Sequence, residues 1–227
     1  MIRCEGLVFE YADGTRALDG LDLAIKPGER VAIVGRNGSG KSTLVRHWNG
    51  LLRPTAGRVL VGGAPTAGRR VAEIARTVAL TFQDPDRQLF GRTCRREVEF
   101  GARNAGLRGR ELDGTVEAAL GVVGLGGRAD ANPYDLGASR RRLLALASVL
   151  AMGTPVVVLD EPTMGLDGWE VERVAAIVAQ LADAGRTVVA ISHDPRFVTG
   201  SFERAVRLDA GRVVADGRPD EVVGSLT

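Results

Sequence analysis

A glycine-rich run near the amino terminus has the residue types and the spacing of a phosphate-binding loop. Residues 35–42 read Gly-Arg-Asn-Gly-Ser-Gly-Lys-Ser, with four residues between the first glycine and Gly-Lys-Ser. Its glycines let backbone N–H groups turn inward around phosphate oxygens, and the following helix adds its positive amino-terminal dipole. Lys41 is then expected to reach the β- and γ-phosphates, and the Ser42 hydroxyl to bind Mg²⁺. The order strand, loop, helix favours this interpretation over a flexible glycine loop.

Two acidic residues directly follow an apolar run. Residues 156–159 are Val-Val-Val-Leu, and Asp160 and Glu161 come next. An acidic residue in this place can hold Mg²⁺ through water, and its neighbour can orient or deprotonate an attacking water. By itself the pair is equally compatible with a structural acidic turn, because many buried strands end in one.

Two further polar residues stand at the ends of apolar runs. Gln83 follows residues 77–82, and His193 comes two residues after residues 187–191. Either residue alone is more often structural than functional. In an open parallel sheet, however, ligands bind outside the carboxyl ends of the strands. We therefore expect Gln83, His193, the acidic pair and the phosphate-binding loop to meet at one edge of a sheet.

The elements that must position these residues alternate between strands and helices. Short apolar strands are expected at residues 30–34, 77–82, 156–159 and 187–191, and an alternating strand ends at residue 25. Helical periodicity covers residues 42–48, 110–123, 139–151 and 169–184. This alternation predicts an α/β fold with a doubly wound core. Residues 205–208 and 213–215 flank Asp-Ala-Gly, which indicates a hairpin.

The chain is predicted to form a single domain with an inserted helical part. Its 227 residues are enough to bury one hydrophobic core. The core is expected in residues 1–87 and 152–227, together with an amino-terminal antiparallel β subdomain. Residues from about 88 to 151 lack strand signals and are expected to form a helical subdomain between two core strands.

Composition limits the class of protein. Hydrophobic residues make up 44% and charged residues 26%, which is ordinary for a soluble domain, and a net charge of +2 does not indicate nucleic acid as a partner. The two cysteines have no disulfide or metal-ligand spacing. The longest apolar stretch, residues 143–152, is about half of what a bilayer crossing needs. If a membrane is involved, another chain is expected to cross it.

Taken together, these motifs resemble those of the ATP-binding-cassette ATPases, and the likeness covers nearly the whole chain. The resemblance identifies residues 35–42 as the Walker A loop and residues 156–161 as Walker B with its catalytic glutamate. Gln83 resembles the Q-loop glutamine, and His193 resembles the switch histidine. Asp167, in Gly-Leu-Asp, resembles the aspartate of the D-loop.

The resemblance also implies a full set of site residues, with ATP and Mg²⁺ as the cofactors. Tyr11, which by itself is more often an ordinary exposed tyrosine, fits the family's adenine-stacking aromatic. The implied nucleotide-binding residues are Tyr11, Gly35, Arg36, Asn37, Gly38, Ser39, Gly40, Lys41, Ser42 and Thr43. The implied metal ligands are Ser42, Gln83 and Asp160, and the implied catalytic residues are Lys41, Gln83, Glu161 and His193.

One motif departs from the family pattern. The signature segment, usually Leu-Ser-Gly-Gly-Gln, falls here on Leu136, Gly137, Ala138, Ser139 and Arg140. In the family, two such domains pack head to tail, and each signature covers the γ-phosphate bound to the other P-loop. Gly137 removes the usual hydroxyl, while Ser139 offers one nearby and Arg140 adds a cation where a helix begins. The departure affects the opposite nucleotide site, not the site made by this chain's own Walker residues.

Within the family, residues 82–90 and 147–152 are most similar to the ATPases of energy-coupling factor importers. That likeness implies ATP hydrolysis that powers uptake of a vitamin or a transition-metal ion, at the cytoplasmic face of the membrane. The implied partners are a second ABC ATPase subunit, identical or different, a transmembrane coupling subunit and a substrate-binding membrane subunit. A partner is expected to dock near Gln83 and residues 88–100. Phe90 and Phe100 either contact that partner or belong to the core of the helical subdomain.

Two other functions fit the sequence less well. Soluble cassettes of translation carry two cassettes in one chain, and those of DNA repair have long insertions, which this chain lacks. A nucleotide-gated module with weak hydrolysis is suggested by the altered signature, but Glu161 and His193 argue against it. The sequence leaves the transported substrate open, as well as the choice between homodimer and heterodimer.

Overall fold

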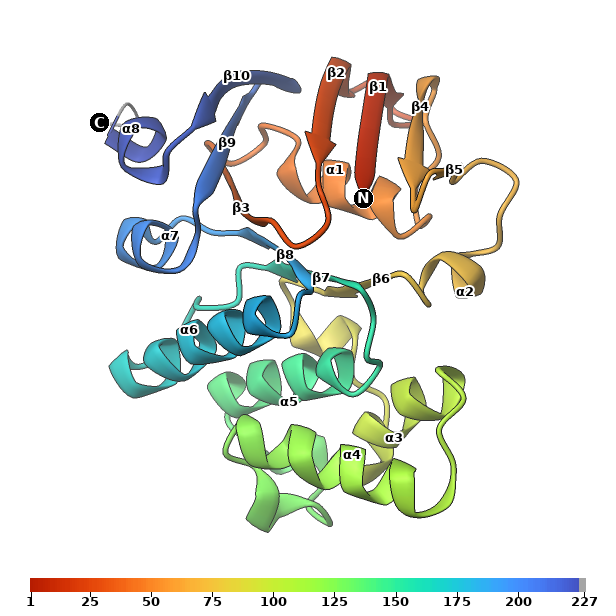
Figure 1. Cartoon of the computed structure of the whole chain (residues 1–227), viewed down its shortest axis with the longest axis vertical. Coiled ribbons are helices and arrows are strands. Elements are labelled where there is room, and N and C mark those ends of the chain that lie inside the picture. The colour runs from red at the N-terminus through yellow and green to blue at the C-terminus, as the bar shows by residue number, and fades with distance from the viewer. Residues whose placement is uncertain (225–227) are drawn as a thin grey trace.

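The computed structural model describes residues 1–224 and contains a six-stranded sheet whose central strands are parallel (Figure 1). In spatial order its strands are β10 (Arg212–Gly217), β9 (Arg204–Asp209), β3 (Arg30–Val34), β8 (Thr187–Ile191), β7 (Val156–Asp160) and β6 (Val78–Thr81). Only the edge pair β9 and β10 is antiparallel, and it forms the hairpin predicted around residue 210. All other neighbours run in the same direction, so their carboxyl ends share one edge.

A second, antiparallel sheet stands beside the first. Its strands are β2 (Arg16–Ile25), β1 (Ile2–Glu10), β4 (Ala56–Val61) and β5 (Ala64–Pro65), in that spatial order. The β1–β2 register pairs Cys4 with Leu23, and both of these side chains are buried. Residues on one face of this sheet are therefore buried against the core. Residues on the other face alternate with them along each strand and are exposed, as is usual for antiparallel sheets.

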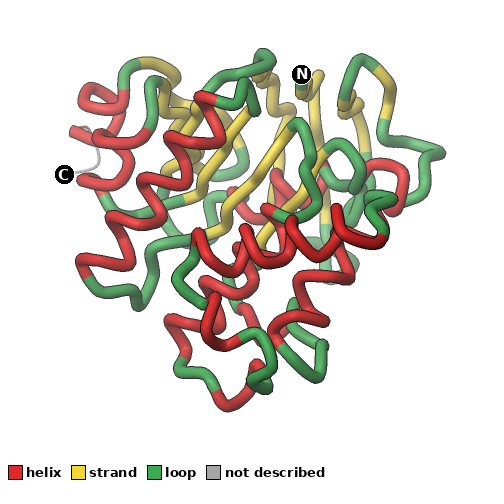
Figure 2. The backbone as a smooth tube through the Cα atoms, turned by 60° about the horizontal axis from the view of Figure 1, so that its bottom comes forward, coloured by secondary structure: helices red, strands yellow, loops and turns green. Residues whose placement is uncertain are grey.

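Some helices cover the six-stranded sheet, and those that lie between β6 and β7 in the sequence form a separate group. They are α1 (Lys41–Trp48), α2 (Val71–Ile74), α3 (Cys94–Asn104), α4 (Gly109–Val122), α5 (Ala138–Leu150), α6 (Gly168–Asp183), α7 (Pro195–Ser201) and α8 (Pro219–Gly224). Helices α3, α4 and α5 pack on one another. Figure 2 brings this helical part forward and shows the red helices in front of the yellow strands.

The six-stranded sheet separates two cores, because alternate residues of its strands face opposite sides. Val31 and Ile33 of β3 pack with α1 and the antiparallel sheet, where Trp48 is fully buried. Ala32 and Val34 face the other side, where α5, α6 and α7 contribute the apolar residues. Burial on both faces explains why the parallel strands are continuous apolar runs.

The predicted α/β class, with a helical insertion and an amino-terminal antiparallel sheet, is confirmed, and element ends differ by a residue or two. The strand predicted at residues 77–82 is shorter: β6 spans only Val78–Thr81. Its ladder stops because the Phe82 N–H donates to the side-chain Oε1 of Gln88, not to a strand. Helix α3 lies inside the predicted helical subdomain, in a part of it where the periodicity predicts no individual helix. The exact domain limits given above remain a prediction.

Candidate active site

A cleft of about 420 Å³ collects polar residues from four strand ends. Its lining residues are Tyr11, Thr15, Arg16, Ala17, Asn37, Gly38, Gly40, Lys41, Ser42, Thr43, Gln83, Asp160, Glu161, Ile191 and His193. The loop after β3, Gln83 after β6, the acidic pair at the end of β7 and His193 after β8 thus meet in one place. The parallel strand directions bring them there, since the carboxyl ends of parallel strands lie at the same edge.

The loop of residues 35–42 is shaped by two glycines that no other residue can replace. Gly35 and Gly40 have φ values of +142° and +101°. A Cβ on Gly35 would stand 2.2 Å from the backbone oxygen of Leu208, and one on Gly40 would stand 2.5 Å from that of Ala17. The loop is therefore packed tightly against β9 and β2. This packing fixes the direction of the N–H groups where α1 begins.

Lys41, the first residue of α1, is buried beneath the loop. Its Nζ donates to the backbone oxygens of Gly35 at 2.8 Å and Arg36 at 2.9 Å. Burial lowers the pKa of the Lys41 ammonium, while Glu161 and Asp160 oppose that change. The loop thus holds a cation on the cleft side of the helix amino terminus, where an anionic phosphate chain is favoured.

Asp160 and Ser42 form an oxygen-rich pair at the floor of the cleft. Asp160 is only 4% exposed, and the Ser42 side chain lies beside its carboxyl group. Burial raises the pKa of Asp160, and Ser42, Arg46 and Lys41 counteract this. Among residues 1–224, Asp160 Oδ1 has no hydrogen-bond partner. A buried carboxylate oxygen left free beside a hydroxyl fits Mg²⁺, which takes few protein ligands and completes its shell with water and substrate phosphates.

Glu161 is held in a strained conformation against His193. Its φ is +51°, unusual for a residue other than glycine, and its N–H donates to the Ile191 oxygen at 2.9 Å. The carboxylate lies 3.2 Å from His193 Nε2 and accepts from the His193 N–H at 3.3 Å. Burial raises the pKa of Glu161 to about 7, and burial followed by the charge of Lys41 lowers that of His193. A carboxyl group with a pKa near neutrality is suited to accept a proton from water.

Tyr11 and Gln83 both line the cleft. The Tyr11 hydroxyl shares a hydrogen bond of 2.8 Å with Thr43 Oγ1, and its ring stands edge-on to Phe9 at a centroid distance of 4.8 Å. The Gln83 backbone oxygen accepts from Arg142 Nη2 at 3.0 Å. Tyr11 is therefore held by a neighbouring cleft residue and by Phe9, and the Gln83 backbone is held by Arg142, which does not line the cleft.

The signature segment and Asp167 do not line this cleft. Gly137 is the N-cap of α5 and provides no side-chain cap, and Arg140 is exposed on the first turn. Asp167 caps α6 in a capping box with Glu170. Both segments stand at helix amino termini outside this chain's own cleft.

Some lining residues were missed from the sequence. Thr15, Arg16 and Ala17 approach the cleft from the start of β2. Arg16 forms ion pairs with Glu10 and Asp19. No motif marks these residues; the available signal was that they follow the turn that begins at Tyr11. His47 on α1 is buried, and its ring stands edge-on to that of Phe9.

Glu161→Gln is expected to stabilise the nucleotide-free protein above neutral pH and to change little in acid. The raised pKa, about 7 against 4.5, means that folding favours the protonated carboxyl. The parent therefore loses stability relative to the amide variant as pH rises from about 4.5 to about 7, by a few kcal/mol at most. Urea denaturation at about pH 5 and about pH 8, with a chelator present, measures the difference. Equal gains at both pH values would contradict the burial argument.

Sequence comparisons match nearly the whole chain. A profile of the family described as ABC transporter matches residues 18–164. An energy-coupling factor transporter ATP-binding protein, EcfA, from Methanocaldococcus jannaschii is 38% identical over 228 aligned residues, covering 100% of this chain and 82% of that protein. A putative ABC transporter ATP-binding protein from Methanosarcina acetivorans is 42% identical over 200 residues, which is 88% of this chain but 38% of that longer relative.

Solved structures share the fold over similar lengths. The structure of cbiO1 from Clostridium perfringens, described as part of the ABC transporter complex cbiONQ, has a TM-score of 0.86 at 35% identity and covers 99% of this chain and 91% of its own. The ATP-binding cassette MJ0796, in a dimeric post-hydrolysis state bound to ADP and phosphate, has a TM-score of 0.88 at 26% identity. That match covers 96% of this chain and 99% of the neighbour.

Proposed function

This chain belongs to the ABC transporter family and is one of its ATPases, and we propose that it powers a membrane importer of the energy-coupling factor type. The observation that carries the proposal is the cleft in which the loop of residues 35–42 faces Glu161 and His193. The importer class is supported by the similarity to EcfA and to cbiO1 along almost the entire chain. A vitamin or a transition-metal ion is the proposed cargo.

In the proposed reaction, each side of the cleft handles a different part of ATP. The adenine stacks on Tyr11, and the phosphates lie in the loop of residues 35–42 against Lys41. Ser42, Asp160 and Gln83 would hold Mg²⁺, which supplies neutralisation of the phosphate charge when bound.

Hydrolysis would then depend on residues at the ends of β7 and β8. Glu161 orients the attacking water and accepts its proton, and the pKa near 7 suits that role. His193, in contact with Glu161, and Gln83, across the cleft, respond to the γ-phosphate. Loss of that phosphate would release these contacts and allow the closed pair of ATPase subunits to reopen.

The proposed working unit contains a second ATPase subunit. The signature segment lies outside this chain's own cleft and carries a free helix amino terminus at Gly137. Such an end favours an anion, and a dimeric solved structure with the same fold gives a precedent for two cassettes acting together. The second subunit is either another copy or a different ATPase.

Arg140→Ala is expected to slow hydrolysis several-fold at the site that this signature segment completes. The guanidinium is exposed on the first turn of α5, so its removal costs a charge-assisted contact to the opposite γ-phosphate and little else. Phosphate release by the assembled dimer measures the effect. In a dimer with a different ATPase, the loss should fall on the partner's site. An unchanged or faster rate would mean that Arg140 does not compensate for the hydroxyl that the family's usual serine provides at the position of Gly137.

A docking surface for a membrane partner is proposed at Phe90 and Phe100. Their side chains are 60% and 52% exposed, so they are not in the core of the helical part. The rings meet edge to face with centroids 4.7 Å apart. A cavity of about 600 Å³ beside Phe100 extends to Met152. An exposed aromatic pair next to a hollow suits an apolar helix end from another chain.

The loop that carries Phe90 is fixed from below. The buried Glu97 carboxylate accepts from the N–H groups of Phe90 at 2.8 Å and Gly91 at 2.6 Å. The Tyr134 hydroxyl donates to the Leu89 oxygen at 3.0 Å. These bonds hold the apolar ring outward despite its contact with water, which supports a binding role. A fixed surface loses less conformational entropy on binding.

The proposed position at the cytoplasmic face requires partners that cross the membrane. Within residues 1–224, no helix combines the length and the apolar character that a membrane span needs. The transmembrane coupling subunit and the substrate-binding subunit of the proposal supply that function.

Replacing both Phe90 and Phe100 with Ser should abolish most copurification with native membrane partners while the ATPase rate of the isolated chain stays near that of the parent. The serines remove the apolar contact area and leave the cleft intact. Val122→Ser is the matched control, because Val122 is an exposed apolar residue on a different helix, α4. Copurification of the double variant at the parent level would reject this surface. If the parent captures no membrane protein, the importer proposal fails.

A further inference from the structure

The guanidinium of Arg142 joins three separate segments of the chain. Arg142 lies on α5, close behind the signature segment, and is partly buried. Its Nη2 donates to the Gln83 oxygen at 3.0 Å, and its Nη1 donates to the Met164 oxygen. Gln83 follows β6, and Met164 comes three residues after Glu161. One side chain therefore bridges the loops at the ends of two neighbouring strands.

The fork of the guanidinium is what makes this bridge possible. Two planar N–H groups reach two carbonyl oxygens at once, whereas a lysine ammonium is a point charge on a flexible stem. A Cβ on Gly165 would stand 3.6 Å from Arg142 Nη1, so the side chain lies against the backbone of that loop. Arg142 Nε has no hydrogen-bond partner in the described part of the chain. The two backbone oxygens are therefore its hydrogen-bond partners, and the carboxylates of Asp84 and Glu161 add charge attraction.

Both anchored loops carry cleft residues whose positions matter for the reaction. Glu161 sits at a φ of +51°, and the Met164 N–H closes a turn by donating to the Glu161 oxygen at 3.3 Å. Arg142 pins the far end of that turn through Met164. On the other side it pins the backbone of Gln83, whose side chain lines the cleft. Catalytic efficiency falls steeply when reacting groups are misplaced by as little as about 1 Å.

We propose that Arg142 is a positioning residue for ATP hydrolysis, which holds the loops of Gln83 and Glu161 in one arrangement and ties both to the helix of the signature segment. It acts through backbone carbonyls and does not line the nucleotide cleft. Neighbouring contacts reinforce the tie: Arg141 is 2.8 Å from Asp86, and Gln88 Nε2 donates to the Ala145 oxygen at 3.0 Å. The inference rests on the proposed roles of Gln83 and Glu161, and it is independent of any membrane partner.

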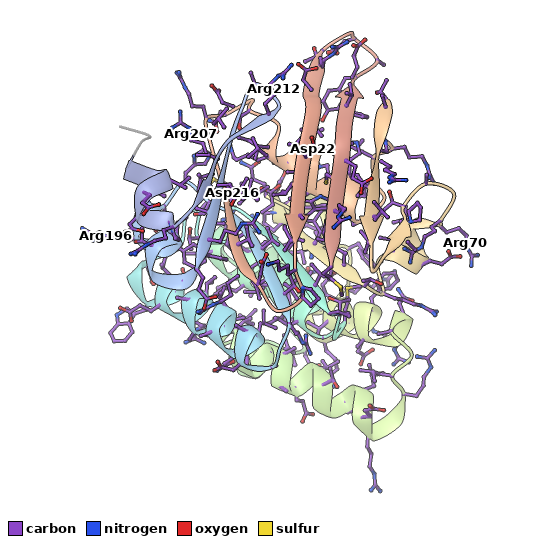
Figure 3. All side chains as sticks on the ribbon, turned by 45° about the horizontal axis from the view of Figure 1, so that its top comes forward. Asp22, Arg70, Arg196, Arg207, Arg212 and Asp216 are labelled. Carbon is purple, nitrogen blue, oxygen red and sulfur yellow. The ribbon has the colours of Figure 1, made fainter. Side chains whose placement is uncertain are left out.

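Arg142→Met keeps the apolar stem and removes the fork, while Arg142→Lys keeps a charge that satisfies one oxygen at a time. Single-turnover hydrolysis by the purified chain should fall about fivefold to tenfold in the Met variant, with the ATP concentration for half-maximal rate changed less than about twofold. Lys should restore only part of the rate. Arg196→Met, at an exposed position on α7 (Figure 3), is the matched control and should behave as the parent.

A double-mutant cycle distinguishes positioning from a general structural role. If Arg142 acts through the loop of Gln83, Gln83→Ala and Arg142→Met together should cost less than the product of their separate effects. Multiplicative losses, an unchanged rate, or full rescue by Lys would overturn the inference. So would a loss accompanied by equally weakened ATP binding and a lower melting temperature. If Arg142→Met does not fold, Arg142→Lys decides. A normal rate in Glu161→Gln would place the failure in the proposed catalytic roles instead.

Discussion

Glu161→Gln is expected to reduce ATP turnover by a factor of roughly 10² or more while Mg²⁺-ATP binding survives. The amide keeps the shape of the side chain and its ability to accept the N–H of His193. It removes the carboxylate that would take a proton from the attacking water. Because the proposed nucleotide contacts come from the loop of residues 35–42 and Tyr11, the affinity for Mg²⁺-ATP should change little. Single-turnover phosphate release and calorimetric titration measure the two quantities separately.

The same variant has a second expected consequence. ATP that binds but is not hydrolysed should hold two cassettes together, so the dimer should persist in gel filtration with ATP and dissociate without it. His193→Ala is the companion variant, since His193 contacts Glu161 but is exposed enough to be replaced without repacking. If Glu161→Gln turns over ATP at the parent rate, Glu161 has a structural role and the proposed mechanism is wrong. A phosphate-release assay on the parent also distinguishes an active ATPase from the alternative of a module with weak hydrolysis.

The parallel core could be predicted from the sequence because strands that are buried on both faces appear as short, continuous apolar runs. Strands β3, β7 and β8 consist mostly of Val, Ile, Leu and Ala, and residues that line the cleft lie at or shortly after the end of each strand. Polar residues at several such ends predict a shared edge once the strands are parallel. That single inference placed Gln83, the acidic pair and His193 near the loop of residues 35–42.

Within the predicted helical subdomain, the periodicity does not mark α3 as a separate helix, because its buried face is narrow and includes an acidic residue. Only Cys94, Val98 and Ala102 form the apolar stripe, and Glu97 is buried among them. The N–H groups of Phe90 and Gly91 satisfy that carboxylate. A buried glutamate with backbone partners cannot be told from an exposed one by residue type. The spacing of four between the apolar residues was the signal available.

Contacts from side chains to backbone oxygens leave no sequence pattern either. The bridge from Arg142 to Gln83 and Met164 depends on carbonyl groups that every residue possesses. The same holds for the approach of residues 15–17 to the cleft, which follows from the packing of β2 against Gly40. Such features become visible only when the strands and helices have been placed in space.

Lys41→Ala is expected to weaken Mg²⁺-ATP binding at least tenfold, a loss of about 1.4 kcal/mol or more, because charge-assisted contacts to the phosphates disappear. Lys41→Arg should also bind Mg²⁺-ATP more weakly than the parent. The buried ammonium fits between the oxygens of Gly35 and Arg36, and a planar guanidinium is larger and differently shaped. The chain itself uses lysine sparingly: of 30 basic residues other than histidine, only Lys26 and Lys41 are lysines.

Calorimetric titration with Mg²⁺-ATP gives the affinity of each variant, and Lys26→Arg, at an exposed turn, serves as the control. The melting temperature without nucleotide verifies that each variant is folded, and the stabilisation produced by ATP should shrink with the affinity. Parent-like affinity in Lys41→Ala would remove the loop of residues 35–42 from the nucleotide site.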